Sequence, residues 1–143
     1  METKTYTPEE IKEASFKFFQ GDDLATKVWT TKYALKDSFG NIYELTPDDM
    51  HRRLAREIAR IERNYANPLD ENELFELFRN FRYIVPQGSP MTGIGNEFQV
   101  ASLSNCFVIG FDGDSDSYGA IIKIDEEQVQ LMKRRGGVGH DLS

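Results

Sequence analysis

A continuous apolar run, "CFVI" at residues 106–109, stands between a serine-rich segment and an acidic turn. Because the run does not alternate with polar residues, it is typical of a strand covered on both faces, and it predicts a buried strand over residues 104–111. A helical pattern follows from Tyr118 to about Arg135 and is ended by Gly136 and Gly137. A buried strand followed by a crossover helix is the unit of a parallel α/β sheet or barrel.

The sequence before residue 83 carries helix start signals instead. Thr7-Pro8-Glu9-Glu10 is a capping box with proline at the first helical position, and Thr46-Pro47-Asp48-Asp49 repeats it with Asp in place of Glu. Asp22 or Asp23 can cap a helix through about Lys32, and Asp70 can cap another. Between these signals, "YALKDSFGNIYEL" predicts two short strands around a turn at 37–41.

Apolar residues recur at helical spacing after each start signal, which indicates one buried face per helix. We therefore expect a helical domain with a small hairpin over residues 1–82, followed by the start of an α/β region over residues 83–143. The side chains expected to face the helical core are Ile11, Ala14, Phe16, Phe18, Phe19, Leu24, Val28, Trp29, Met50, Leu54, Ile58, Ile61, Tyr65, Leu74, Leu77, Phe78 and Phe81.

The bulk composition excludes several classes of protein. The chain is 39% hydrophobic, which is typical of a globular domain, and its net charge of −7 disfavours a general electrostatic grip on nucleic acid. One cysteine cannot form an internal disulfide, and no apolar run approaches the length of a membrane span. The first ten residues lack the apolar core of a signal peptide. We expect a cytoplasmic protein without a nucleic-acid or membrane partner.

Three short features suggest chemistry, and each has a simpler structural explanation. Cys106 can be a buried packing residue, and neither histidine lies near it in sequence to form a Cys/His pair. The acidic turn at 112–117 resembles a calcium loop but has Ser117 at the sixth position and Lys123 at the twelfth. "RRGGVG" follows its helix, so it predicts a glycine C-cap rather than a phosphate-binding loop.

The charged residues of the helix from Met50 are expected to form a solvated face. They are Arg52, Arg53, Glu57, Arg60, Glu62 and Arg63.

The order and spacing of several blocks carry more information than any single motif. "SP" at 89–90, "SLSNCFVI" at 102–109, "DSYGAI" at 116–121 and "KRRGGVGHDLS" at 133–143 resemble the large, catalytic subunit of ribonucleotide reductases. "YALKDSFGNIYELTPDDMHRRLAREIA" is similar to the region that precedes this core. The resemblance implies a mainly α N-terminal domain followed by the first strand–helix elements of the family's ten-stranded α/β barrel, that is, the N-terminal portion of such a subunit.

The resemblance also implies roles for individual residues. Cys106 resembles the cysteine that, paired with a second cysteine, reduces the 2′ position of a ribonucleoside diphosphate or triphosphate. Ser89, Asn105 and Gly137, with Cys106, match positions that contact the substrate. The residues that match the site for the allosteric deoxynucleoside triphosphate at the dimer interface are Asp116, Ser117, Tyr118 and Lys133.

Some positions depart from the family pattern. Asn105 replaces the commoner Ser, "SPMTGIGN" differs from the usual loop, and the loop at 110–115 is longer than in many relatives. No segment resembling an ATP-cone is found ahead of Thr7, so control by that module is not expected. The partner cysteine, the thiyl-radical cysteine and the Asn-x-Cys-x-Glu segment have no counterpart in the 143 residues.

The resemblance implies partners beyond this chain. They are the remainder of the catalytic subunit with the radical cysteine, a second subunit in a homodimer, a thioredoxin-type reductant, and either adenosylcobalamin or a metal-containing radical subunit. No cofactor or metal is expected on this segment itself, and we expect it to be inactive alone.

The alternative is a non-catalytic module that binds a nucleotide or a partner. Tight binding of deoxynucleoside triphosphates by the isolated chain would favour that module.

Overall fold

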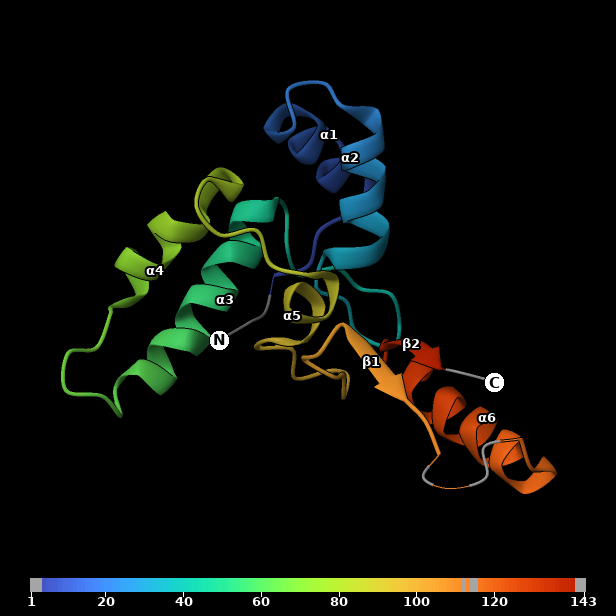
Figure 1. Cartoon of the computed structure of the whole chain (residues 1–143). Helices are drawn as coiled ribbons and strands as arrows, with labels where there is room; N and C mark the ends of the chain where they lie inside the picture. Colours follow the sequence, from blue (N-terminus) through green and yellow to red (C-terminus); the bar gives the residue numbers. More distant parts are fainter. Residues whose placement is uncertain (1–3, 112, 114–115, 141–143) are drawn as a thin grey trace.

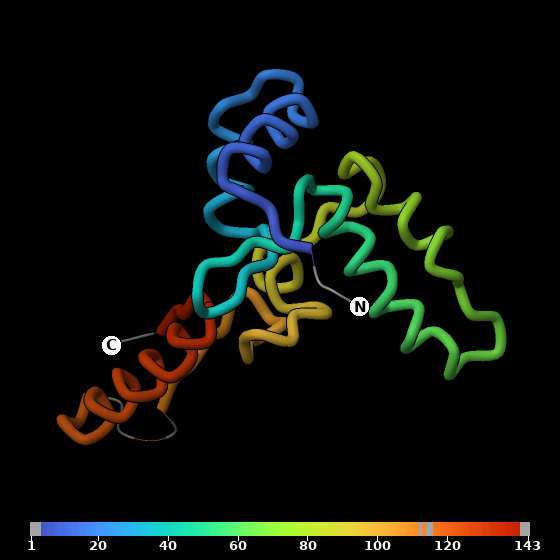
Figure 2. The backbone as a smooth tube through the Cα atoms, turned by 180° about the vertical axis from the view of Figure 1, so that it is seen from behind, coloured from blue at the N-terminus to red at the C-terminus, as the bar shows by residue number. Residues whose placement is uncertain are grey.

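The computed structural model describes residues 4–111, 113 and 116–140. The helical part contains α1 (Pro8–Phe18), α2 (Asp23–Val28), the π-helix η1 (Trp29–Tyr33), α3 (Pro47–Glu62), α4 (Glu71–Phe78) and the 3-10 turn η2 (Arg79–Phe81). The short helix α5 (Gly88–Gly93) leads to β1 (Cys106–Ile109), α6 (Tyr118–Met132) and β2 (Gly137–His140). Figure 1 shows the pair α1–α2, the pair α3–α4 and the β1–α6–β2 unit as three arms around α5. The view from behind in Figure 2 agrees.

The predicted helix starts are confirmed by hydrogen bonds. The Thr7 N–H donates to Glu10 Oε2 at 2.8 Å and the Glu10 N–H donates to Thr7 Oγ1 at 3.3 Å, which completes the capping box of α1. Asp22 caps α2, Asp70 caps α4, and Thr46 forms a capping box with Asp49 before α3. These caps satisfy backbone N–H groups that a helix N-terminus would otherwise leave without a partner.

Six of the expected core side chains are buried, seven more are half-buried, and Met91 of α5 joins the buried group. The cluster is formed by Ile11, Trp29, Ala34, Ile42, Met50, Leu54, Ala55, Ala59, Leu74, Phe75, Phe78 and Met91. Six members of the cluster were not expected from the helical spacing: Ala34, Ile42, Ala55, Ala59, Phe75 and Met91. Four expected members are exposed: Phe16 at 40%, Leu24 at 73%, Ile61 at 43% and Tyr65 at 64%.

Three of these four exposed positions have simple geometric causes. The buried face of α2 is set by Thr26 and Trp29, and Leu24 lies about 200° around the helix axis from Thr26. Ile61 and Tyr65 adjoin the exposed loop at 63–70, which leaves them uncovered.

The expected hairpin is reduced to isolated bridges. Ile42 forms antiparallel bridges with Lys36 and with Tyr6. The turn itself is held by Asp37, whose Oδ1 accepts from the N–H groups of Phe39 and Asn41, both at 2.9 Å. The structure therefore has the predicted turn, but not the two regular strands.

The β1–α6–β2 unit consists of two parallel strands connected by a helix. Cys106 pairs with Gly137 at one end of the two strands, and Ile109 pairs with His140 at the other. Ile109 shares a hollow with Leu131 of α6. Cys106 and Val108 point to the other face, where Val108 is 92% exposed. The prediction of a buried strand was therefore wrong, because α6 covers only one face of the two strands.

The turn after α6 explains the glycine pair. The helix ends at Met132, and Arg135 adopts a left-handed φ of 67°. A Cβ at Gly136 would lie 2.7 Å from Cε2 of Phe107, so only glycine lets the chain pass this ring. Gly137 then begins β2.

Candidate functional site

Ser89, at the start of α5, is the buried anchor of the candidate site. Ser89 is only 3% exposed to solvent. The Ser89 N–H donates to Asn105 Oδ1 at 3.0 Å, and its hydroxyl donates to the carbonyl oxygen of Arg135 at 3.3 Å. Ser89 therefore joins α5 to the residue before β1 and to the turn before β2.

Asn105 connects Ser89 to the two other predicted substrate contacts, Gly137 and Cys106. Its carbonyl oxygen accepts from the Gly137 N–H at 2.7 Å, and its Nδ2 lies 3.7 Å from Cys106 Sγ. A Cβ built on Gly137 would lie 3.6 Å from the same sulfur, so Gly137 is in van der Waals range of Cys106. The structure thus brings together all four residues predicted to contact a substrate: Ser89, Asn105, Cys106 and Gly137.

A cavity of about 300 Å³ opens beside this group. Ser89 and Asn105 line it together with Thr31, Lys32, Tyr33, Gly88, Thr92 and Arg135. Cys106 does not line this cavity, but it directly follows Asn105, which does, and it lies on the exposed face of β1. A cavity of this size with several polar groups in its wall can hold part of a small molecule.

Two cations hydrogen-bond to backbone carbonyl groups of η1, and one of them, Arg135, also lines the cavity. Arg135 Nη1 donates to the Lys32 carbonyl oxygen at 3.5 Å, and Lys36 Nζ donates to the Thr31 carbonyl oxygen at 3.2 Å. Burial, and then the nearby positive charge of Arg135, lower the pKa of Lys36. Lys32 and Arg135 line the cavity, so its edge carries positive charge although the whole chain is acidic.

The residues predicted to bind an effector lie at the two ends of α6. Asp116 is exposed, Ser117 caps the helix by accepting from the Ala120 N–H at 3.2 Å, and Tyr118 is 83% exposed. Lys133 follows the last turn, about 24 Å away along the helix axis. Within one chain, these four residues do not form a single site.

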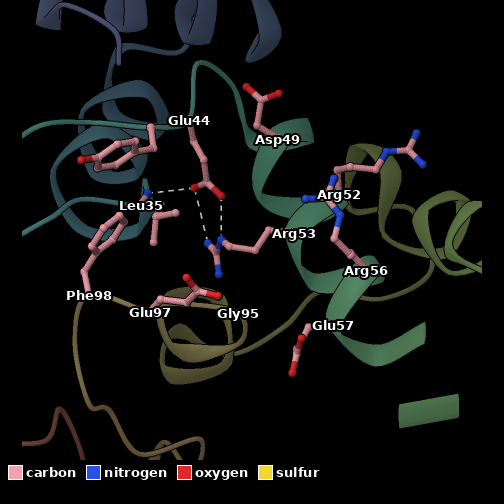
Figure 3. Close-up of a pocket in the computed structure, with 11 residues that line it drawn as sticks. Leu35, Glu44, Asp49, Arg52, Arg53, Arg56, Glu57, Gly95, Glu97 and Phe98 are labelled. Atoms are coloured by element: carbon pink, nitrogen blue, oxygen red, sulfur yellow. Dashed lines mark hydrogen bonds and ion pairs between the residues drawn. The ribbon is translucent and has the colours of Figure 1, made fainter. Parts of the chain in front are cut away.

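A buried ion pair was missed by the sequence interpretation. Arg53 was expected on a solvated face, but its side chain is only 10% exposed, and Arg53 Nε donates to Glu44 Oε1 at 2.7 Å (Figure 3). That prediction was wrong because Arg53 follows Met50 by three residues, which places it beside the apolar face of α3. The burial of Glu44 could have been predicted from the sequence: in extended chain, residues two apart lie on the same side, and Glu44 follows the buried Ile42 by two residues.

The pair borders a second cavity of about 440 Å³. Tyr43 and Phe98 form a stacked pair at its edge, with ring centroids 4.8 Å apart. Arg52 and Arg56 also line it, and both lie within 4.0 Å of the Glu71 carboxylate on α4. Arg53 is thus paired with a carboxylate in the wall of this second cavity, whereas Arg52 and Arg56 are paired with a carboxylate outside it.

The remaining sequence features give no further site. Asp112, Asp114 and Ser115 of the acidic turn lie outside the described residues. Among residues 4–111, 113 and 116–140, no three His, Cys, Asp or Glu side chains are grouped so that they could hold a metal ion. No helix in that part of the chain is both long and apolar enough to span a bilayer.

Comparison with known proteins gives one result for the family. Residues 19–92, just over half of the chain, match the family model described as the all-alpha domain of ribonucleotide reductase. No curated protein matches the chain. The matched segment runs from the end of α1 through Ser89 and most of α5.

Proposed function

Since the chain belongs to the ribonucleotide reductase large-subunit family, we propose that Cys106 is one of its two reducing thiols. The observation that carries this proposal is a single connected group: Asn105 and Gly137 lie beside the exposed thiol, and Ser89 holds Asn105 in place by a hydrogen bond. The cavity beside them has room for part of a small polar substrate, and its positive edge suits a phosphorylated one.

The proposed reaction replaces the 2′-hydroxyl of a ribonucleoside diphosphate or triphosphate by hydrogen. The hydroxyl leaves as water, two thiols lose their hydrogens, and a disulfide forms between their sulfurs. A separate thiyl radical starts the sequence and is regenerated at its end. A thioredoxin-type dithiol then reduces the disulfide, so that electrons and atoms balance over the cycle.

Three residues would support Cys106 in this reaction. Asn105, held through its carbonyl and Oδ1, keeps its Nδ2 near the sulfur and can donate to a substrate oxygen. The Ser89 hydroxyl can turn from the Arg135 carbonyl toward a ligand. Gly137 leaves the approach to Cys106 unobstructed, since it has no side chain.

Because the chain contains a single cysteine, both the second reducing thiol and the radical cysteine must come from other residues of the enzyme. We therefore propose that these 143 residues are inactive alone and act with the remainder of the barrel. The radical source, either adenosylcobalamin or a metal-containing subunit, belongs to those other parts in this proposal.

The effector site is proposed to form between two subunits. Tyr118, Ile122, Val129 and Met132 of α6 are all more than half exposed and apolar. If α6 packs antiparallel against its copy, Lys133 of one subunit comes close to Asp116 of the other, with a phosphate and a ribose hydroxyl as suitable ligands. We expect Lys133→Ala to weaken deoxynucleoside triphosphate binding in a titration of the assembled enzyme, and unchanged binding would contradict the site.

The catalytic role is tested by complementation. The chain is mixed with a polypeptide that supplies the rest of the subunit and its radical source, and formation of deoxynucleotide is measured with thioredoxin as reductant. We expect Cys106→Ser to abolish thioredoxin-driven turnover, whereas the control Ser104→Ala, which removes an exposed hydroxyl two residues away, leaves it unchanged. Full turnover by Cys106→Ser would refute the proposed role.

A further inference from the structure

The ion pair between Glu44 and Arg53 is the most deeply buried charge pair in the described part of the chain, with side chains 4% and 10% exposed. Glu44 is fixed from two sides, since its Oε2 also accepts from the Leu35 N–H at 2.8 Å. A buried charge pair costs desolvation energy and is tolerated only when its hydrogen-bonding atoms have partners. The other hydrogen bonds of Arg53 therefore show what the pair supports.

Those other hydrogen bonds all go to one short segment. Arg53 Nη2 donates to the Met91 carbonyl oxygen at 2.9 Å, and Nη1 donates to the Ile94 carbonyl oxygen. Met91 lies in α5 and Ile94 caps its C-terminal end. A cation at this end is electrostatically favourable, because helix C-terminal carbonyls carry partial negative charge.

The opposite end of α5 carries Ser89. Since α5 spans only Gly88–Gly93, Arg53 and Ser89 hold the same turn and a half of helix from its two ends. Ser89 in turn holds Asn105 Oδ1, and Asn105 Nδ2 reaches Cys106 Sγ. A continuous set of hydrogen bonds and one rigid helix thus joins Arg53 to the thiol.

The neighbouring backbone leaves room for Arg53 only because residue 95 is glycine. Gly95 has φ +68°, and a Cβ built on it would lie 2.9 Å from Cγ of Arg53. Figure 3 shows Arg53 between Glu44 and the segment with Gly95. The planar guanidinium can serve a carboxylate and two carbonyls at once, which the single ammonium of lysine cannot do in the same geometry.

We propose that Arg53 is a positioning residue for the substrate site: through α5 it sets the place of Ser89 and, through Asn105, that of Cys106. This role rests on the function proposed above. Arg53 touches neither Cys106 nor the cavity beside Ser89, so it acts only through the elements that it holds.

Two variants of the full chain test this role, each with a matched control. Arg53→Lys keeps the positive charge but removes the planar guanidinium that donates to several acceptors at once. Its control, Arg60→Lys, makes the same change in the exposed ion pair with Glu57 on the same helix. Gly95→Ala pushes against Arg53 without removing it. Gly40→Ala imposes the same kind of backbone strain, at φ +88°, where a Cβ meets nothing within 4 Å.

Two readouts are taken at a temperature where the amide exchange of Leu54 shows that the helical core is intact. The first is the exchange of the Ser89 amide, which we expect to rise about tenfold in Arg53→Lys and Gly95→Ala over their controls, because the bond to Asn105 opens more often. The second is kcat in the complementation assay, which we expect to fall by about 10²-fold, as for misplacement of a reacting group by about 1 Å.

The possible failures are distinct. If both variants only lower the unfolding temperature, while Ser89 exchange and kcat stay at the control values, Arg53 merely stabilises the fold and the positioning role is refuted. If instead Cys106→Ser retains full turnover, the proposed function fails, whatever the exchange of Ser89 shows.

Discussion

The helical part and the β1–α6–β2 unit of this chain bury their apolar residues to very different extents. Among the described residues, twelve buried apolar residues form one cluster in the part that ends with α5, whereas two, Ala120 and Ile124, are buried in the strand–helix–strand unit. In that unit Val108 is 92% and Val129 is 61% exposed. The helical part therefore has a shared apolar core, while the second unit presents apolar faces of the kind that other protein surfaces cover.

The candidate site lies where the two regions meet. Ser89 belongs to the segment that packs with the helical core through Met91, and Asn105, Cys106 and Gly137 belong to the less buried unit. A well-packed region thus supports residues on a region that has little core of its own.

The largest effect is expected from the core of the helical part. Leu54 is fully buried on α3, so Leu54→Ala should lower the free energy of unfolding by about 2–5 kcal/mol through lost burial and a cavity. In contrast, Ile122→Ala on α6, at 57% exposure, should change it by less than about 0.5 kcal/mol. Urea unfolding followed by circular dichroism measures both. Equal losses would show that the two regions are stabilised alike.

A smaller and more local effect is expected in the second unit. Gly136→Ala places a Cβ against Phe107 and should cost about 1–3 kcal/mol, as overpacking usually does. Gly139→Ala in β2, where a Cβ meets nothing within 4 Å, is the control. Amide exchange should accelerate in β2 and leave α3 unchanged. Faster exchange in α3 as well would indicate that the regions unfold together.

The smallest effect concerns pH and the helical part. Burial lowers the pKa of His51, and the hydrogen bond and charge of Asp48 only partly offset this. The folded chain therefore binds the proton less readily than the unfolded chain. Stability should fall as pH drops through about 6.5, the unfolded value, by at most about 1.4 kcal/mol per pH unit.

His51 lies between Phe78 and Phe81, which makes phenylalanine a suitable replacement. His51→Phe should remove this pH dependence between about pH 5 and 7. Unfolding curves at several pH values test this, and an unchanged dependence would assign it to other groups.

Much of the local structure could be predicted from the sequence because it depends on neighbouring residues. Thr7, Asp22, Thr46 and Asp70 each satisfy backbone N–H groups within three residues, so their helix starts are readable without knowing the fold. The strand at Cys106 and the helix after Ser117 are found for the same reason. The ten-stranded barrel and the boundary at residue 83 stay predictions.

Burial was predicted less well because it depends on what packs from a distance. The run "CFVI" suggested two covered faces, but α6 covers one and leaves Val108 exposed. Charge on α3 suggested a solvated face, but Glu44 and two carbonyls near α5 draw Arg53 inward. Both outcomes depend on residues that lie far away in the sequence, which a local sequence pattern does not reveal.

The sequence by itself thus determined the helix starts, the order of the elements and, through the spacing of its motifs, the resemblance to ribonucleotide reductases that the match over residues 19–92 confirms. Only the tertiary structure decided that Asn105 and Gly137 lie beside Cys106 and that Ser89 holds Asn105 there. It also decided that Arg53 hydrogen-bonds to α5, the helix that carries Ser89. The physical reason is range: caps and turns act over a few residues, whereas the Ser89 hydroxyl and the Arg135 carbonyl oxygen are 46 residues apart in sequence and 3.3 Å apart in space.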